Sequence, residues 1–414
     1  MNRDTPARTV CGASGPSAAT PAAVPYPFSD RHTFDLEPPY ADLQRSDQLH
    51  RVQLPHGGPA WLAVRYDHVR QILADPRFSR AHANRADIPR LSSEVLPATS
   101  MMALDPPEHT RIRRALAPHF TADRIEHLRP RATAGAEELL ETMAAAGRPA
   151  DLLAHLAIPF PLLMICELLG MSAREREHFT DFASALRSAR LPPAARQAAR
   201  HRFETFVADH LLTPGVHTPD GLLAALRRDR DEQTLSTAEI VDVVIALLVG
   251  GVGSPSTLLA SGVCLLLRRP DLVAWLTADP GRVPAAAEEL LRLVPVGVAG
   301  GFVRVATQDI TVGATLVHAG EAVLPAMTAA NRDPAAFPDP LTLRPDRPAT
   351  PRHLGLGHGA HHCVGAHLAR VELQVALTAL FARMPALRLA VDESDLHWHE
   401  GLVVRELKEL PVSW

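Results

Sequence analysis

Apolar side chains near the start of the chain follow two different spacings. Residues 52–54 and 60–65 alternate apolar and polar side chains around a Pro-His-Gly-Gly turn, which predicts a short β-hairpin. Helical spacing follows over residues 66–79, and this helix is expected to end before Pro76. Residues 81–100 show no periodicity and predict a long loop, a kind of segment that often covers or binds a ligand.

Helical spacing dominates the middle of the chain. A proline-marked helix start lies within residues 102–116, and several Ala- and Leu-rich helical patterns follow between residues 132 and 208. Breaks in these later patterns are expected at Pro159, at Pro161 and at residues 191–193. The stretch as a whole predicts a bundle of helices.

A long apolar helix is predicted to begin at Thr237 and to end before Pro270. Pro255 lies inside it and cannot donate a backbone hydrogen bond, and neighbouring glycines weaken the same turn. We therefore expect a kink there that leaves room for a ligand. A further helix is predicted over residues 284–295, and strand-like runs follow at 310–312 and 322–324. These patterns predict a mainly α fold with small β-sheets.

Composition narrows the class of protein without identifying it. The apolar fraction of 46% in 414 residues supplies a large core, and single-domain enzymes of this size are common. Residues 1–25 are rich in Ala, Pro, Ser, Thr and Gly and are expected to form a disordered leader, which leaves one domain over residues 26–414. The net charge of −4 argues against nucleic acid or a membrane surface as the main partner.

Two further features of the composition concern location. No run of about 18 or more apolar residues is found, so no membrane span is expected. The four cysteines lack the spacing of a disulfide framework, which favours a reducing cytoplasm.

The densest chemistry lies in residues 353–370, where glycines and histidines surround Cys363. Three glycines before the cysteine and one after it allow a tight loop that can lie close to a flat object. A helical pattern begins directly afterwards, and the dipole at a helix N-terminus favours the thiolate, which is the metal-binding form of cysteine. This design suits a sulfur ligand to a planar metallocofactor such as haem.

Two other interpretations of Cys363 remain open on these residues alone. A lone cysteine is often a small, buried, apolar side chain. Five histidines of the same segment could instead help to bind zinc, namely His353, His358, His361, His362 and His367. Structural zinc sites take paired ligands from a second element at set spacings, and the sequence contains no such second pair. Zinc is therefore the weaker interpretation.

The segment resembles the haem-binding signature of the cytochrome P450 superfamily, Phe-Gly-x-Gly-x-His-x-Cys-x-Gly. The matching residues are Gly357, Gly359, His361, Cys363 and Gly365, and Leu356 replaces the phenylalanine. The resemblance extends over about residues 25–414, with further motifs in the family's order. It implies the cytochrome P450 fold and a bacterial enzyme of secondary metabolism that is soluble, cytoplasmic and monomeric. It also implies haem b bound through Cys363, and electrons supplied by NAD(P)H through a ferredoxin and its reductase.

The same resemblance assigns roles to residues outside the loop. His109 and Arg113, four residues apart on one helical face, match the family's ligands of one haem propionate. Arg304, in a strand-like run at 302–306, matches the arginine that meets the other propionate, and His361 is a further candidate. These four basic residues are expected around the propionates.

Other matches concern the scaffold and the substrate. Glu289 and Arg292 match the family's Glu-x-x-Arg, and Arg347 matches the third member of that cluster, which is expected to hold the cysteine loop in place. The residues expected to contact a small-molecule substrate are Val296, Val298, Ala299 and Gly250.

The long helix departs from the family's acid-alcohol pair, which relays protons to bound oxygen. Counted back from Arg269-Pro270, Gly253 stands at the acid and Ser254 at the alcohol. Moving the match by two residues places Ser256 and Thr257 at the alcohols, but the acid is still missing. General acid–base delivery is worth about 10²–10⁴-fold in rate, so its loss matters.

Two reactions are compatible with this departure, and a third function remains open for the chain as a whole. The first is oxidative coupling of an aromatic or cyclic dipeptide substrate, because a similar Gly-rich stretch occurs in family members of that kind. The second is ordinary hydroxylation of a macrolide, terpene or peptide, with Ser254 and ordered water moving the protons. A haem-carrying or metal-binding protein without turnover is the third alternative.

Overall fold

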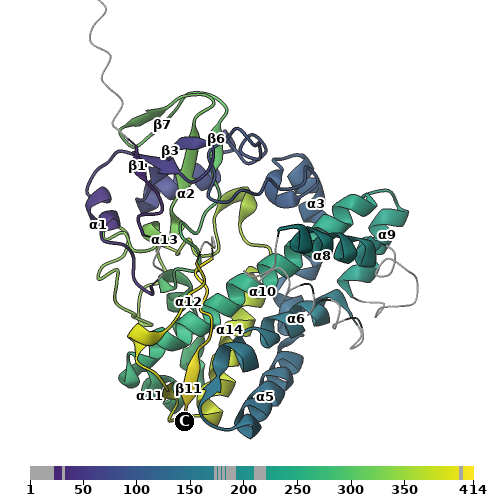
Figure 1. The fold of residues 1–414 in the computed structure, drawn as a ribbon, viewed down its shortest axis with the longest axis vertical. Coiled ribbons are helices and arrows are strands. Elements are labelled where there is room, and N and C mark those ends of the chain that lie inside the picture. The colour runs from purple at the N-terminus through teal and green to yellow at the C-terminus, as the bar shows by residue number, and fades with distance from the viewer. Residues whose placement is uncertain are drawn as a thin grey trace, which may run out of the picture.

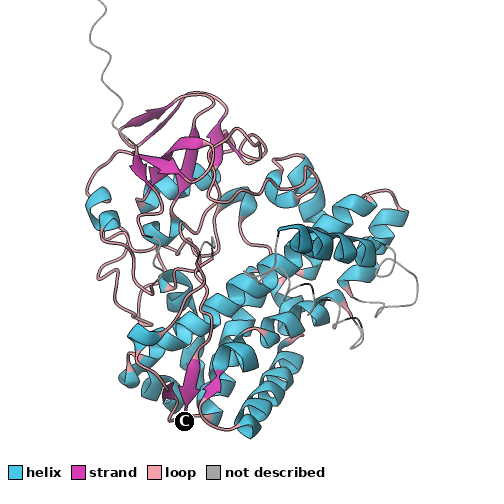
Figure 2. Cartoon of the chain, in the orientation of Figure 1, coloured by secondary structure: helices cyan, strands magenta, loops and turns pink. Residues whose placement is uncertain are grey.

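The structure is a computed structural model of the 414-residue chain, and it describes residues 23–29, 33–171, 175, 179, 182, 193–208, 221–400 and 404–414. Most strands gather at one end of the molecule, and helices make up most of the remainder (Figure 2). The mainly α fold with small sheets that the sequence predicts is therefore confirmed.

The helices in the described part of the chain are α1 (Pro39–Leu43), α2 (Tyr66–Ala74), α3 (Glu108–Leu116), α4 (Ala122–Glu126), α5 (Arg129–Ala146), α6 (Pro159–Leu169), α8 (Pro193–Phe206), α9 (Leu222–Asp231), α10 (Thr237–Leu267), α11 (Pro270–Ala278), α12 (Val283–Leu293), α13 (Met327–Ala330) and α14 (Ala366–Arg383). Figure 1 shows α10 crossing the middle of the molecule. It packs against α6 and α14, and buried side chains of all three belong to the largest apolar core.

The strands form three sheets. The largest has the order β1 (Val24–Pro25), β2 (His50–Leu54), β3 (Gly58–Ala63), β9 (Ala322–Pro325), β6 (Arg304–Ala306) and β4 (Phe78–Ser79). A three-stranded sheet has the order β10 (Arg388–Leu389), β11 (Pro411–Ser413) and β5 (Ala150–Asp151), and β7 (Ile310–Val312) pairs with β8 (Thr315–Val317). The predicted hairpin is β2 and β3, and the predicted loop over residues 81–100 contains no helix or strand.

The N-terminal segment differs from the expected leader at its end. Val24 and Pro25 pair in parallel with Val52 and Gln53, so both belong to the main sheet. Backbone pairing with an existing strand orders this segment despite its composition. Residues 1–22 of the predicted leader lie outside the described residues.

The prolines at the first two predicted breaks lie at the start of a helix. Pro159 and Pro161 lie in the first turn of α6, where a missing backbone N–H has no intrahelical partner to lose. The third expected break, at residues 191–193, falls largely outside the described residues.

Helix α10 is continuous over 31 residues, with Pro255 inside it. A capping box fixes its start, because Ser236 accepts a hydrogen bond from the backbone of Glu239 while the Glu239 side chain accepts one from the backbone of Ser236. By length and composition this helix could cross a membrane, although Asp242, Ser254 and Pro255 interrupt its apolar residues, so it contains no continuous apolar run of about 18. It has 61% of its most apolar window buried inside the protein, as expected of a core helix.

Candidate active site

The loop before Cys363 has a backbone that only glycine adopts easily. Gly357 and Gly359 have φ angles of +76° and +72°. A Cβ atom at Gly359 would lie 2.3 Å from the carbonyl oxygen of Leu73, so the loop also packs too closely on α2 for a side chain. The backbone N–H of Cys363 donates to the carbonyl of Leu356 at 2.8 Å. This folded loop presents Cys363 directly before α14.

Cys363 is solvent-accessible, yet protein surrounds its sulfur closely enough for burial to raise the pKa of the thiol. The backbone N–H of Gly365 and the charges of Arg113 and Arg370 act in the opposite direction. The sequence predicts a favoured thiolate at this helix N-terminus, but burial outweighs these favourable contributions. A metal that binds here therefore has to displace the thiol proton.

The structure brings together the basic residues predicted around the propionates. The rings of His109 and His361 lie 4.2 Å apart, and Arg113 donates to the carbonyl of His362. Burial, followed by the positive charges of His109, Arg304 and others, lowers the pKa of His361 to about 2. Burial also lowers the pKa of Arg304, to about 10.

This basic cluster lacks matching negative charge in the described part of the chain. Nε2 of His361 and Nε of Arg304 are buried without a hydrogen-bond partner there. Unpaired buried donors are costly, so the cluster fits a group that carries carboxylates. Haem, whose two propionates are carboxylates, is such a group.

One member of this region was not identified from the sequence. Arg80 is buried beside Arg304, and its guanidinium lies 4.6 Å from the centre of the Phe302 ring. Its position depends on the pairing of β4 with β6, whose residues are far apart in the sequence. A short Phe-Ser-Arg run carries no signal of that pairing.

Glu289, Arg292 and Arg347 form the predicted cluster. The carboxylate of Glu289 accepts from Arg292 at 2.6 and 2.8 Å and from Nε of Arg347 at 3.1 Å. Arg292 also donates to the carbonyl of Asn331, and the side chain of Asn331 accepts from the backbone of Leu354 at 2.6 Å. The cluster is therefore connected through Asn331 to the start of the cysteine loop.

The centre of α10 offers open space at the predicted glycines. A Cβ atom at Gly250 or Gly253 would meet nothing within 4 Å, and Ser254 is partly exposed. Ser256 is fully buried and donates to the carbonyl of Val252 at 2.6 Å. The match that places the alcohol at Ser254 therefore leaves it partly accessible, whereas Ser256 and Thr257 of the alternative match are buried.

The segment before β6 contains three of the predicted substrate contacts, and two of them are buried. Val298 and Ala299 are only 5% and 0% exposed and belong to the core of the main sheet, where the Tyr26 hydroxyl donates to the carbonyl of Val298. Neither side chain reaches an open space, because these two residues close the sheet's apolar core. Val296 is partly exposed. Phe302, which was not predicted, is 53% exposed.

The alternative of a zinc site gains no support. The described residues contain no group of three or more His, Cys, Asp or Glu side chains that could hold a metal ion. His353 contacts Glu288 at 3.1 Å instead of turning toward Cys363. His361 instead lies against His109, with their ring centroids 4.2 Å apart.

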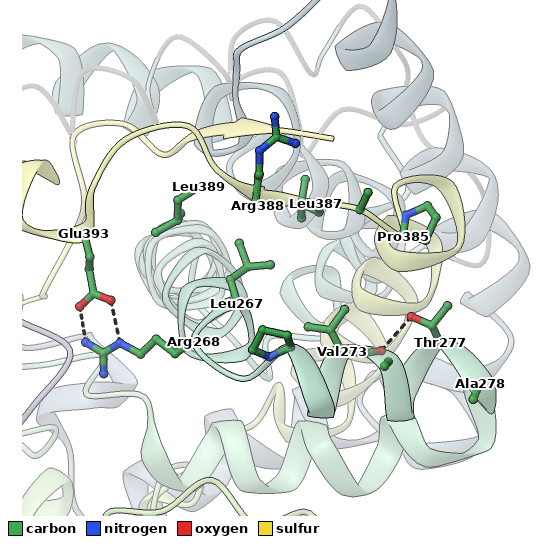
Figure 3. Close-up of a pocket in the computed structure, with 13 residues that line it drawn as sticks. Leu267, Arg268, Val273, Thr277, Ala278, Pro385, Leu387, Arg388, Leu389 and Glu393 are labelled. Carbon is green, nitrogen blue, oxygen red and sulfur yellow. Dashed lines mark hydrogen bonds and ion pairs between the residues drawn. The ribbon is translucent and has the colours of Figure 1, made fainter.

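A pocket of about 800 Å³ lies at the opposite end of α14 (Figure 3). Its rim includes the ion pair of Arg268 with Glu393, and Leu267 and Leu387 line it. Because α14 has 18 residues, a rise of about 1.5 Å per residue separates its two ends by about 27 Å. This pocket is therefore distinct from the site at Cys363.

Known proteins similar to this chain belong to the family that the geometry of the cysteine loop suggests. The family model described as Cytochrome P450 matches residues 282–395. Mycinamicin IV hydroxylase/epoxidase of Micromonospora griseorubida is 44% identical over 401 residues, which cover 96% of this chain and 100% of that protein. Nocardicin C N-oxygenase of Nocardia uniformis subsp. tsuyamanensis is 43% identical over 391 residues, covering 94% and 98%.

A solved structure extends the comparison to the fold. The crystal structure of cytochrome P450mel 107F1, described as having biaryl coupling reactivity, superposes with a TM-score of 0.85 at 35% identity. The match covers 95% of this chain and 100% of that one. Since these relatives match nearly the whole chain at well over 30% identity, the chain belongs to the cytochrome P450 family.

Proposed function

We propose that this cytochrome P450 monooxygenase of secondary metabolism binds haem b through the thiolate of Cys363. The observation that supports this most is the cysteine loop, whose positive-φ glycines present an accessible sulfur beside an uncompensated basic cluster. Haem held by a thiolate supplies the family's oxidising chemistry, because the sulfur pushes electron density toward iron and favours O–O cleavage.

The residues around the loop have separate tasks in this proposal. Buried, unpaired donors on His361 and Arg304 bind propionate carboxylates, together with His109 and Arg113. The cluster of Glu289 with two arginines keeps the cysteine loop in its conformation. When haem is bound, Cys363 would hold its iron and these basic side chains would hold its propionates.

The proposed reaction is oxidative coupling of an aromatic or cyclic dipeptide substrate. Gly253 supplies no acid, and the partly exposed hydroxyl of Ser254, the next residue of α10, can donate or accept a proton. Coupling removes two hydrogens from the substrate and reduces O2 to two waters, with the other two electrons coming from NAD(P)H and two protons from solvent, so no oxygen atom enters the product. A relative with biaryl coupling reactivity supports this choice.

Ordinary oxygen insertion is the second candidate. Two relatives of more than 40% identity are a hydroxylase/epoxidase and an N-oxygenase, which favours this reaction. In that case Ser254 and an ordered water chain deliver the protons.

The two reactions differ in product mass and in their response to an added acid. Substrates are first identified by the spectral shifts that cyclic dipeptides, macrolides or terpenes cause on binding. The masses of the products are then measured by mass spectrometry. Hydroxylation adds one oxygen, whereas coupling removes hydrogens. Gly253→Glu, for which open space exists at the Cβ position, is expected to raise the oxygenated product about tenfold or more.

Gly253→Gln is the matched control, because it adds the same bulk without an acid. Equal product distributions in the Glu and Gln variants would contradict the role assigned to the missing acid. A main product of the wild-type enzyme that contains one added oxygen would favour the second candidate.

Electron supply from NAD(P)H through a ferredoxin and its reductase is a further part of the proposal. Exposed Arg114 and Arg352 lie on elements beside the cysteine loop, where they suit an acidic partner. Turnover that proceeds equally well when the ferredoxin is omitted would contradict it. A monomeric state and a cytoplasmic location remain predictions.

A further inference from the structure

Arg80 and Arg304 occupy opposing positions of two paired strands. β4 and β6 pair antiparallel, with Phe78 opposite Ala306 and Ser79 opposite Val305, so the next pair in this register is Arg80 with Arg304. The two residues are only 7% and 5% exposed. Like charges directly opposite each other destabilise a sheet, and burial strengthens that repulsion. Such an arrangement calls for an anion nearby.

The hydrogen bonds of the Arg80 side chain do not supply that anion. Its Nε and Nη2 donate to the carbonyl of Met102 at 3.1 and 2.8 Å, and its Nη1 donates to the carbonyl of Val303 at 2.5 Å. A guanidinium has five N–H donors, so two are left for another partner. Burial, together with the charge of Arg304, lowers the pKa of Arg80 to about 9.

The nearest acid is engaged elsewhere. Asp105 accepts from the backbone N–H groups of Arg80 and Ala81 and from the Ser79 hydroxyl, so its oxygens hold the turn after β4. One carboxylate also cannot balance Arg80, Arg304 and the adjacent basic side chains. Negative charge from outside the chain is therefore expected here.

Phe302 joins this cationic site to an exposed apolar surface. Its ring lies 4.6 Å from the guanidinium carbon of Arg80, and it is more than half exposed although it is large and apolar. Phe302 is two residues before Arg304, so in an extended chain both side chains point to the same side, toward the basic cluster. Arg80 thus covers one part of the ring and leaves the remainder open.

We propose that Arg80 is a haem-propionate ligand whose guanidinium also holds Phe302 as an apolar wall of the substrate site. The inference rests on the proposed haem-thiolate function and adds two residues to it. One side chain then fixes both the edge of the cofactor and a surface that the substrate contacts. A bidentate arginine suits a carboxylate, and the cation over the ring fixes the ring's position.

The first test measures how fast ferric holoenzyme loses haem to excess apomyoglobin. Arg80→Gln removes the charge and is expected to accelerate the loss about tenfold, since a hydrogen bond to a charged group is involved. Arg80→Lys keeps the charge and about the same length, and its rate of haem loss is expected to lie between the rates of Arg80→Gln and the wild type. Arg51→Gln is the control, because Arg51 stacks on Trp61 and pairs with Glu321, and its rate should stay within about twofold.

The chemistry of the contact is tested with haem dimethyl ester, whose carboxylates are blocked. The Arg80 variants should lose this ester no faster than the wild-type protein does. Wild-type rates of haem loss in both Arg80 variants would overturn the proposal, as would an equal acceleration with the ester. Failure of the wild-type protein itself to bind haem with a thiolate spectrum would instead overturn the proposed function.

The second test concerns Phe302 and uses clotrimazole and imidazole, which both bind iron from the substrate side. Phe302→Ala should weaken the binding of clotrimazole, which carries three benzene rings on its imidazole, about three- to tenfold relative to the binding of imidazole. The same variant should lose haem at close to the wild-type rate. An unchanged preference for clotrimazole, or haem loss as fast as in Arg80→Gln, would overturn the role of Phe302 as a wall.

Discussion

Glu289 illustrates how single residues hold the site. It is almost completely buried, and its carboxylate accepts from the side chains of Arg292 and Arg347 and from the backbone of Arg344 at 3.0 Å. Charges removed from water in this way need their full set of partners, because breaking a buried pair leaves the other charge uncompensated. The geometry of this cluster fixes residues that precede the cysteine loop.

Replacing that carboxylate should therefore be costly. Glu289→Gln is expected to lower the free energy of unfolding in urea by about 3–5 kcal/mol, because two arginines remain buried without an acid. Glu126→Gln, which removes an exposed partner of Arg129, is the control and should change it by less than about 1 kcal/mol. Similar values for the two variants would contradict the role of the Glu289 cluster.

The cysteine loop is the element on which the site depends most. Its glycines allow the backbone to turn back so that the N–H of Cys363 reaches the carbonyl of Leu356, while the start of α14 fixes the position of the sulfur. Gly359 combines a positive φ with close packing on α2, so two separate constraints exclude a side chain there.

Alanine substitutions at two glycines, Gly359 and Gly320, distinguish the effect of a positive φ from the effect of close packing. Gly359→Ala is expected to reduce the haem content of the purified protein strongly, since its Cβ would lie 2.3 Å from a backbone oxygen of α2. Gly320→Ala has a similar φ of +86° but open space around the Cβ, so it should cost only about 1 kcal/mol and leave haem content unchanged. The measurement is the ratio of haem absorbance to protein, and equal ratios in both variants would argue against close packing as the cause.

At the scale of the whole molecule, local signals predicted the elements well. Caps, prolines and glycine turns lie close in sequence to what they determine, which is why the hairpin, helix α10 and the cysteine loop could be placed. Arg80 and Phe302 could not be identified, because their surroundings depend on pairing between β4 and β6. The burial of Ala299 could not be foreseen for a similar reason, since it depends on the packed sheet.

In the whole molecule, the proposed haem site at Cys363 lies far from the pocket of Figure 3. The pocket of Figure 3 and the cysteine loop lie at opposite ends of α14, and α10 packs against α14 within the helical core. Cys264, buried in α10, and Cys363 thus have different surroundings, and burial raises the pKa of the Cys264 thiol to about 12. Among the cysteines of the described residues, Cys363 is the one expected to bind iron through sulfur.

The most direct test is the absorption spectrum of the reduced protein after carbon monoxide is added. The wild-type protein and a Cys264→Ala control should show the red-shifted Soret band of a thiolate-bound haem, and Cys363→Ala should lose it. A red-shifted band that survives in Cys363→Ala, or is absent from the haem-loaded wild-type protein, would contradict the assignment of Cys363 as the iron ligand.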